Sequence, residues 1–243
     1  MTSHERIIGS LVLALGIVLA GWLIGRGLMA WRTADRYVTV KGFSEREVKA
    51  DIALWPIRFV STNDNLGRAQ ADIKKSKDII LSFLEKHGID PKTVEIQKFE
   101  VTDILANPYR GTGTVQSRYI ILQTLMVRVK DPSLVIAASQ AIGELVDAGV
   151  ILSANPGMES TPSYLYTGLN TLKPEMIAEA TASARLAAEQ FAKDSGSRVG
   201  GIRKASQGVF EILPRDRTPG MMEWTQPQKT VRVVSTVEYY LQD

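Results

Sequence analysis

The chain contains no cysteine and only two histidines, His4 and His87. Without cysteine it can form no disulfide bond, thiolate metal site or thiol nucleophile. His4 precedes a long apolar run and His87 falls at the end of a predicted helix, so neither has a second histidine beside it for a zinc site or a Ser–His–Asp triad. We therefore predict that the protein is not an enzyme and that it holds no catalytic residue, metal or cofactor.

The body of the chain also lacks an excess of either charge. The net charge is +3, but beyond residue 36 there are 25 basic and 24 acidic residues. Binding to nucleic acid depends largely on neutralising phosphates with Lys and Arg. A nearly neutral body therefore predicts no nucleic-acid partner.

Long apolar runs are missing except for one, Ile7 to Gly25, which holds nineteen residues without a charge and ends at Arg26. As a helix it would cover about 28 Å, close to the hydrocarbon thickness of a bilayer. We therefore expect one N-terminal transmembrane helix within an anchor and neck, residues 1–36. The residues expected in the span include Ile7, Leu11, Leu15, Val18, Trp22 and Gly25.

Two other interpretations of this run stay open. It could be a signal peptide cleaved after Val18-Leu19-Ala20, or a helix buried in a core. The run continues past Ala20, which favours a retained span. Gly21 and Gly25 form a small-xxx-small pair that permits close helix approach in lipid, so Gly21 is a candidate oligomer contact. Arginines after the span, taken alone, would place the body in the cytoplasm.

Periodicity in residues 37–243 predicts one α+β domain, an antiparallel sheet with three packed helices and possible sub-lobes 37–130 and 131–243. On the second strand, Ala53, Trp55, Ile57 and Phe59 share a face, and Pro56 requires an edge or a bulge there. Gly42 with Ser44 suggests a turn or bulge. The strands are expected at about 37–42, 47–62, 93–105, 117–130, 198–213 and 230–241, with two short possible strands within 150–167 around a turn at Asn155-Pro156-Gly157. The helices are expected at about 64–87, 131–148 and 171–195.

Two segments are candidate oligomer interfaces. The helix at 171–195 has a stripe of mostly small residues that would let it sit close to a sheet or to another helix. The stripe consists of Ile177, Ala180, Ala184, Ala187, Ala188 and Phe191, of which Ala184 and Ala188 are the candidate contacts. The loop from Pro214 to Gln228 carries Met221, Met222 and Trp224, and Met and Trp are enriched at interface centres. Packing on its own domain and a role as a ligand lid stay open for this loop.

Four pieces of the chain carry a family resemblance. They are Val38–Gly42, Ala50–Ala53, Tyr119–Asp131, and Arg185-Leu186-Ala187 followed by Ala192, Gly196 and Val199-Gly200. Together they resemble the SIMPL-domain family of bacterial cell-envelope proteins, which includes a periplasmic immunogenic protein and a proposed oxidative-stress defence protein. This chain has Gly42-Phe43-Ser44 where the family has Gly-x-Gly, and Ala50-Asp51 where it has Pro-Asp. The resemblance implies an α+β fold, extracytoplasmic placement and self-assembly into large ring- or barrel-like oligomers. It implies no catalytic residues.

The expected function combines these predictions. We expect a single-pass protein of the inner (cytoplasmic) membrane whose domain is extracytoplasmic and forms a large homo-oligomeric ring or cage. Its partners are membrane lipid and further copies of itself, and its role is structural, as a scaffold, or in envelope stress. Two alternatives are a small-ligand or peptide binding module at the membrane surface and a hydrolase that uses carboxylates or hydroxyls.

Overall fold

The computed structural model describes residues 3–34, 36–106, 117–153 and 160–242, and in the first helix it describes the side chains of residue 11 and residues 13–27. The helices are α1 (Ser3–Ala34), α2 (Leu66–Lys86), α3 (Pro132–Gln140), α4 (Gly143–Asp147) and α5 (Leu169–Asp194), with short 3-10 turns η1 (Pro91–Thr93), η2 (Ile104–Ala106) and η3 (Glu223–Thr225). The strands are β1 (Tyr37–Lys49), β2 (Ile52–Asn63), β3 (Val94–Asp103), β4 (Tyr119–Val129), β5 (Ser163–Leu165), β6 (Arg198–Gln207), β7 (Glu211–Pro214) and β8 (Gln228–Gln242). The predicted α+β class with antiparallel pairing is confirmed. The turn predicted at 155–157 lies outside the described residues.

The chain divides into two compact units. One, here called the alanine unit, contains the residues up to 44, 175–209 and those from 233 onward. The other, the tryptophan unit, contains 45–174 and 210–232. The predicted sub-lobes, 37–130 and 131–243, differ from this division. Strands β1 and β8 and helix α5 each contribute residues to both units, so no single point in the sequence separates them.

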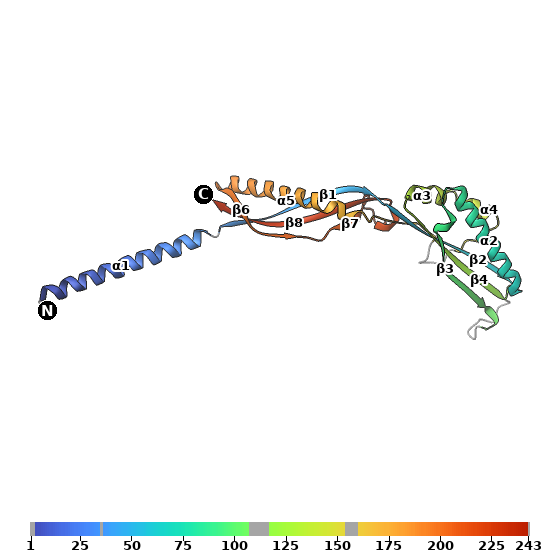
Figure 1. The fold of residues 1–243 in the computed structure, drawn as a ribbon, viewed down its shortest axis with the longest axis horizontal. Coiled ribbons are helices and arrows are strands. Elements are labelled where there is room, and N and C mark those ends of the chain that lie inside the picture. The colour runs from blue at the N-terminus through green and yellow to red at the C-terminus, as the bar shows by residue number, and fades with distance from the viewer. Residues whose placement is uncertain (1–2, 35, 107–116, 154–159, 243) are drawn as a thin grey trace. The chain divides into compact units, whose positions relative to one another are not determined.

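The tryptophan unit is built on a sheet with strand order β3-β4-β2-β5. Strands β2 and β4 pair antiparallel from Ala53 opposite Val129 to Asn63 opposite Tyr119. Helices α2, α3 and α4 gather beside this sheet in Figure 1, and their apolar residues join its buried face in one core. Trp55 lies in that core fully buried, and its indole N–H donates to the Ser160 carbonyl at 2.8 Å.

Details of this unit refine the sequence prediction. Pro56 pairs with Met126 of β4. On the other edge of β2, Pro56 lies between the residues that pair with β5 and Phe59, which forms an isolated bridge to Leu152. Among the described residues, no strand residue pairs with Pro56 on that side, which suits a residue that lacks a backbone N–H. The single helix predicted for 131–148 is divided into α3 and α4. The division follows from non-helical backbone at Ala141, which ends α3.

The alanine unit is built on a sheet in which β8 lies between β1 and β6, with α5 packed along it (Figure 1). Inward-facing residues of β8, including Val237 and Tyr239, alternate with outward-facing ones. They form a small core with Val40 of β1. The buried residues of α5 recur every fourth position: Met176, Ala180, Ala184, Ala188 and Ala192.

Helix α5 packs very closely against β1 at Gly42. The sequence prediction of a turn there is wrong, because β1 is continuous from Tyr37 to Lys49, and the predicted bulge stays a prediction. A Cβ added at Gly42 would lie 2.0 Å from the Ala180 carbonyl oxygen and 2.3 Å from the Ala184 nitrogen. Glycine is needed because helix backbone occupies the space of a side chain. Two positions on, the Ser44 hydroxyl donates to the Glu179 carboxylate at 2.6 Å.

Candidate interaction surfaces

Helix α1 exposes apolar side chains at its described positions. Leu11, Leu15 and Val18 are each more than 60% exposed, and a Cβ added at Gly21 or Gly25 would meet nothing within 4 Å. The guanidinium of Arg26 stacks over the Trp22 ring at 5.2 Å, at the end of the apolar run. This pairing places an amphipathic ring beside a cation, a combination that suits a membrane–water boundary.

The predicted span begins at Ile7, whose side chain lies outside those described. Among the described residues, no helix has the length and apolar character required to cross a bilayer.

A second surface is the loop of residues 215–227, here called the Met–Trp loop. It leaves β7, turns at Gly220, whose φ of 84° favours glycine, and forms η3 before entering β8. The Pro227 carbonyl accepts from the Ala50 backbone N–H at 2.8 Å. Met221, Met222 and Trp224 are each about half exposed (49%, 51% and 49%).

Two buried polar side chains hold the Met–Trp loop in place. Gln226 donates to the Asp216 carbonyl at 2.9 Å and accepts from the Asp216 N–H at 3.2 Å, so one side chain bridges the two arms of the loop. Lys229 is fully buried; its ammonium donates to the Glu223 carbonyl at 2.8 Å and forms an ion pair with the Glu223 carboxylate. A buried ammonium without such partners would be strongly destabilising. The apolar side chains are therefore displayed on a fixed support.

The sequence predicted the exposed members of this loop and missed its supports. Lys229 follows the same two-residue period as Val231 and Val233, which marks it as an inward-facing position of β8. A lysine at an inward position requires a buried acceptor. That signal was present in the sequence, whereas the role of Gln226 depends on the loop's fold.

The other predicted interface residues, Ala184 and Ala188, do not lie on the surface. Both are fully buried in the core of the alanine unit, against β1 and β8 of the same chain. Their small size serves the close approach of α5 to Gly42. We therefore correct the prediction: contacts within the chain already cover these two residues, and they are not available to a second subunit.

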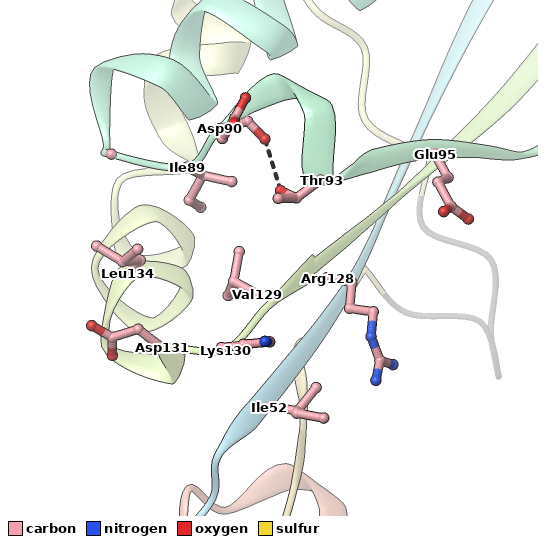
Figure 2. A pocket seen from close by; sticks show the side chains of 11 residues that line it. Ile52, Ile89, Asp90, Thr93, Glu95, Arg128, Val129, Lys130, Asp131 and Leu134 are labelled. Atoms are coloured by element: carbon pink, nitrogen blue, oxygen red, sulfur yellow. Dashed lines mark hydrogen bonds between the residues drawn. The ribbon is translucent and has the colours of Figure 1, made fainter.

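A hollow of about 510 Å³ lies in the tryptophan unit at the ends of β2 and β4 (Figure 2). Apolar side chains of Ile52, Ile89, Val129 and Leu134 line it, together with Arg128, Lys130 and acidic residues. Two of the acids serve as helix caps. Asp90 accepts from the Lys92 N–H. Asp131 accepts from the Ser133 hydroxyl and N–H, which lower the pKa of the Asp131 carboxyl.

A second hollow of about 560 Å³ lies at the base of the Met–Trp loop, and its lining is almost entirely charged. It is lined by Glu45, Arg46, Glu47, Arg215, Arg217 and Thr230. Arg215 pairs with Asp216 at 2.9 Å, and this carboxylate raises the pKa of Arg215. Among the described residues, no group of three or more His, Asp or Glu side chains is placed to hold a metal ion.

Comparison with protein families gives a match over residues 38–239, to the family described as "SIMPL: Protein of unknown function (DUF541)". The match covers both units and leaves α1 outside it. Comparison with curated proteins gives no match.

Proposed function

The chain belongs to the SIMPL (DUF541) family, and on that premise we propose that it is a non-enzymatic, membrane-anchored protein of the cell envelope that assembles with copies of itself. Helix α1 is the single-pass anchor in the inner membrane, and the two units form the extracytoplasmic part. The assembly is a large ring or cage with a structural, scaffold or envelope-stress role. The display of Met221, Met222 and Trp224 on a fixed loop is the observation that carries this proposal.

The Met–Trp loop has the features of an interface centre. Trp is among the residues that contribute most to protein–protein affinity, and Met adapts its shape to a partner. A loop already held by Gln226 and Lys229 loses little conformational entropy on binding. A partner that covers the loop therefore gains apolar burial without first having to order it.

The anchor explains the apolar surface of α1. The uncharged run Ile7–Gly25 has the length of a span, and its described apolar side chains, such as Leu11, Leu15 and Val18, are largely exposed. Buried in lipid, those side chains would be favourably solvated. In an oligomer each subunit contributes one anchor, so the anchors act together through avidity and hold the assembly more firmly than one would.

Electron microscopy of the full-length protein in mild detergent tests the assembly. We expect closed particles of several subunits. Replacing two loop residues with acids, Met222→Asp with Trp224→Asp, should shift the particles toward single subunits. A control for one added acid is Val146→Asp on α4, a position 57% exposed and far along the chain from the loop. Single subunits from the unaltered protein would refute the proposal.

Alkaline carbonate extraction of membranes tests the anchor separately. The full-length protein should stay in the membrane pellet. A double substitution, Leu15→Arg with Val18→Arg, should release it, because charged residues near the middle of a span are costly. Recovery of the unaltered protein in the soluble fraction would refute the anchor and leave the assembly to be judged by microscopy.

A second candidate function is the binding of a small ligand or a peptide. The hollow in Figure 2 favours it, because about 510 Å³ falls within the usual size range of ligand sites and its walls are partly apolar. A thermal-shift screen of short peptides and small amphipathic molecules should then give a rise in melting temperature that Leu134→Lys abolishes. An unchanged melting temperature across the screen would dismiss this candidate.

A further inference from the structure

We propose that strand β3 is a self-pairing edge: the β3 strands of two copies pair antiparallel about a two-fold axis at Phe99. The two sheets of order β3-β4-β2-β5 would thereby join into one continuous sheet across the two copies. This inference rests on the proposed self-assembly and names one surface that carries it.

Strand β3 is exposed for nearly its whole length. It is an edge of its sheet, bonded to β4 on one side (Figure 1). Eight of its ten residues are exposed. Among them Ile96, Phe99 and Val101 are exposed by 58%, 50% and 48%. A long edge strand with apolar side chains offers a row of backbone groups to any strand that can pair with it.

The exposed apolar residues continue the core face of the sheet. Ile96, Phe99 and Val101 lie opposite Leu125, Gln123 and Ile121 of β4, and all three partners are buried. Residues directly opposite on antiparallel strands share a face. On the face of the sheet that points to the core, the residues of β4 are therefore buried and those of β3 are exposed.

An irregularity in β3 fixes which residues share that face. The register with β4 shifts between Ile96 and Lys98, so Gln97 is an extra residue of a bulge. On one face lie Ile96, Phe99 and Val101. On the other lie Lys98 and Glu100, whose side chains form an ion pair at 2.7 Å.

One antiparallel register satisfies both faces at once. With Phe99 opposite the partner's Phe99, Lys98 lies opposite the partner's Glu100, and the two-fold axis repeats this pair. With Gln97 bulged as it is beside β4, Ile96 lies opposite the partner's Val101. Six apolar side chains then meet on one face, and two Lys–Glu pairs form on the other.

The charges select this register against its neighbours. A two-fold axis at residue 98 would place Lys98 opposite the partner's Lys98, and an axis at residue 100 would place Glu100 opposite the partner's Glu100. Like charges directly opposite each other destabilise a strand pair. Lysine and a bulge on an edge strand also discourage indiscriminate pairing. The same features thus disfavour the registers with a two-fold axis at residue 98 or residue 100 and permit the one centred on Phe99.

Disulfide trapping tests the register, because the chain has no cysteine of its own. In the full-length protein in mild detergent, Phe99→Cys should cross-link two copies on mild oxidation. Directly opposite Cα atoms lie roughly 4.5–5.5 Å apart, within the range that a disulfide spans. The control is Ile96→Cys, whose two copies would be separated by about four residue steps, roughly 13 Å, and should not cross-link.

Charge exchange tests whether the pairing is between chains. Lys98→Glu alone and Glu100→Lys alone should each lower the mass measured by light scattering, because each places like charges opposite each other. Mixing the two variants should restore the mass, since each supplies the charge that the other needs. If the variants acted only by breaking the Lys98–Glu100 ion pair within one chain, mixing them would not restore the mass.

The outcomes separate this inference from the proposed function. Cross-linking at Phe99 but not at Ile96, together with restoration on mixing, supports it. Multi-subunit particles that cross-link equally at both positions, or that are unaffected by the charge variants, overturn the pairing and leave the proposed assembly standing. Single subunits from the unaltered protein overturn both.

Discussion

The cores of the two units are packed in opposite ways. The tryptophan unit fills its core with large side chains, including Trp55, Ile57 and Phe59, each fully buried. The alanine unit brings backbone against backbone, with Ala180 and Ala184 of α5 lying over β1. The stability of the tryptophan unit should therefore fall most when side-chain atoms are removed, and that of the alanine unit when atoms are added.

The largest expected effect is on the tryptophan unit. Trp55→Ala would empty the centre of its core and remove the hydrogen bond to Ser160. Such truncations cost about 3–5 kcal/mol of unfolding free energy. Hydrogen exchange measured by mass spectrometry should show protection lost first in β2 and β4. Equal loss of protection in the alanine unit would show that the two cores do not differ as described.

In the alanine unit, the addition of atoms should be the more damaging change. Gly42→Ala adds one methyl group where the Ala180 carbonyl oxygen would lie 2.0 Å away, and that atom is backbone. Overpacking of this kind costs about 1–3 kcal/mol. The control is Gly201→Ala on β6, where an added Cβ meets nothing within 4 Å. Denaturant unfolding should separate the two variants, and equal stabilities would contradict the close packing of α5.

A smaller loss of stability is expected when the N-terminal cap of α2 is removed. The side chain of Asn65 caps α2 by accepting from the Arg68 N–H at 3.1 Å. Asn65→Ala should cost about 1 kcal/mol, and Asn65→Ser, which keeps an acceptor, should cost less. The loss should appear as faster exchange in the first turns of α2 while α5 stays unchanged. Equal stability of the Ala and Ser variants would show that the cap contributes nothing.

The smallest expected effect is the loss of stability when the pH is lowered. Hydrogen bonds from Arg118 lower the pKa of Asp103, and one from Lys86 lowers that of Glu144. Both carboxyls belong to the tryptophan unit. A carboxyl with a lowered folded-state pKa stabilises the fold above its unfolded-state pKa, and the stability is lost as the pH falls through the folded value. Melting temperature should thus decline below about pH 4, where such groups titrate, and Arg118→Leu should reduce the decline. An unchanged decline in Arg118→Leu would exclude the Asp103 pair as a cause.

The sequence predicted the tryptophan unit better than the alanine unit, for a physical reason. Alternation of large apolar residues on β2 correctly identified Trp55, Ile57 and Phe59 as one buried face. A stripe of alanines gives a weaker signal, because alanine is common on both faces of helices. The predicted buried face includes Phe191, which is 58% exposed, whereas Ala192 is buried.

Features that depend on two distant segments could not be predicted. Gly42 looked like a turn because its need for space comes from Ala180, more than 130 residues later. The interleaving of the two units has the same origin. The loop residues Met221 and Trp224 could be proposed as an interface from composition, but the polar contacts that hold them required the folded chain.

The central claim is that this protein associates with copies of itself, and its mass in solution tests that claim most directly. Multi-angle light scattering on the full-length protein in mild detergent, corrected for bound detergent, should give a mass of several subunits at micromolar concentration. A mass of 26.7 kDa, that of one chain, would contradict the account.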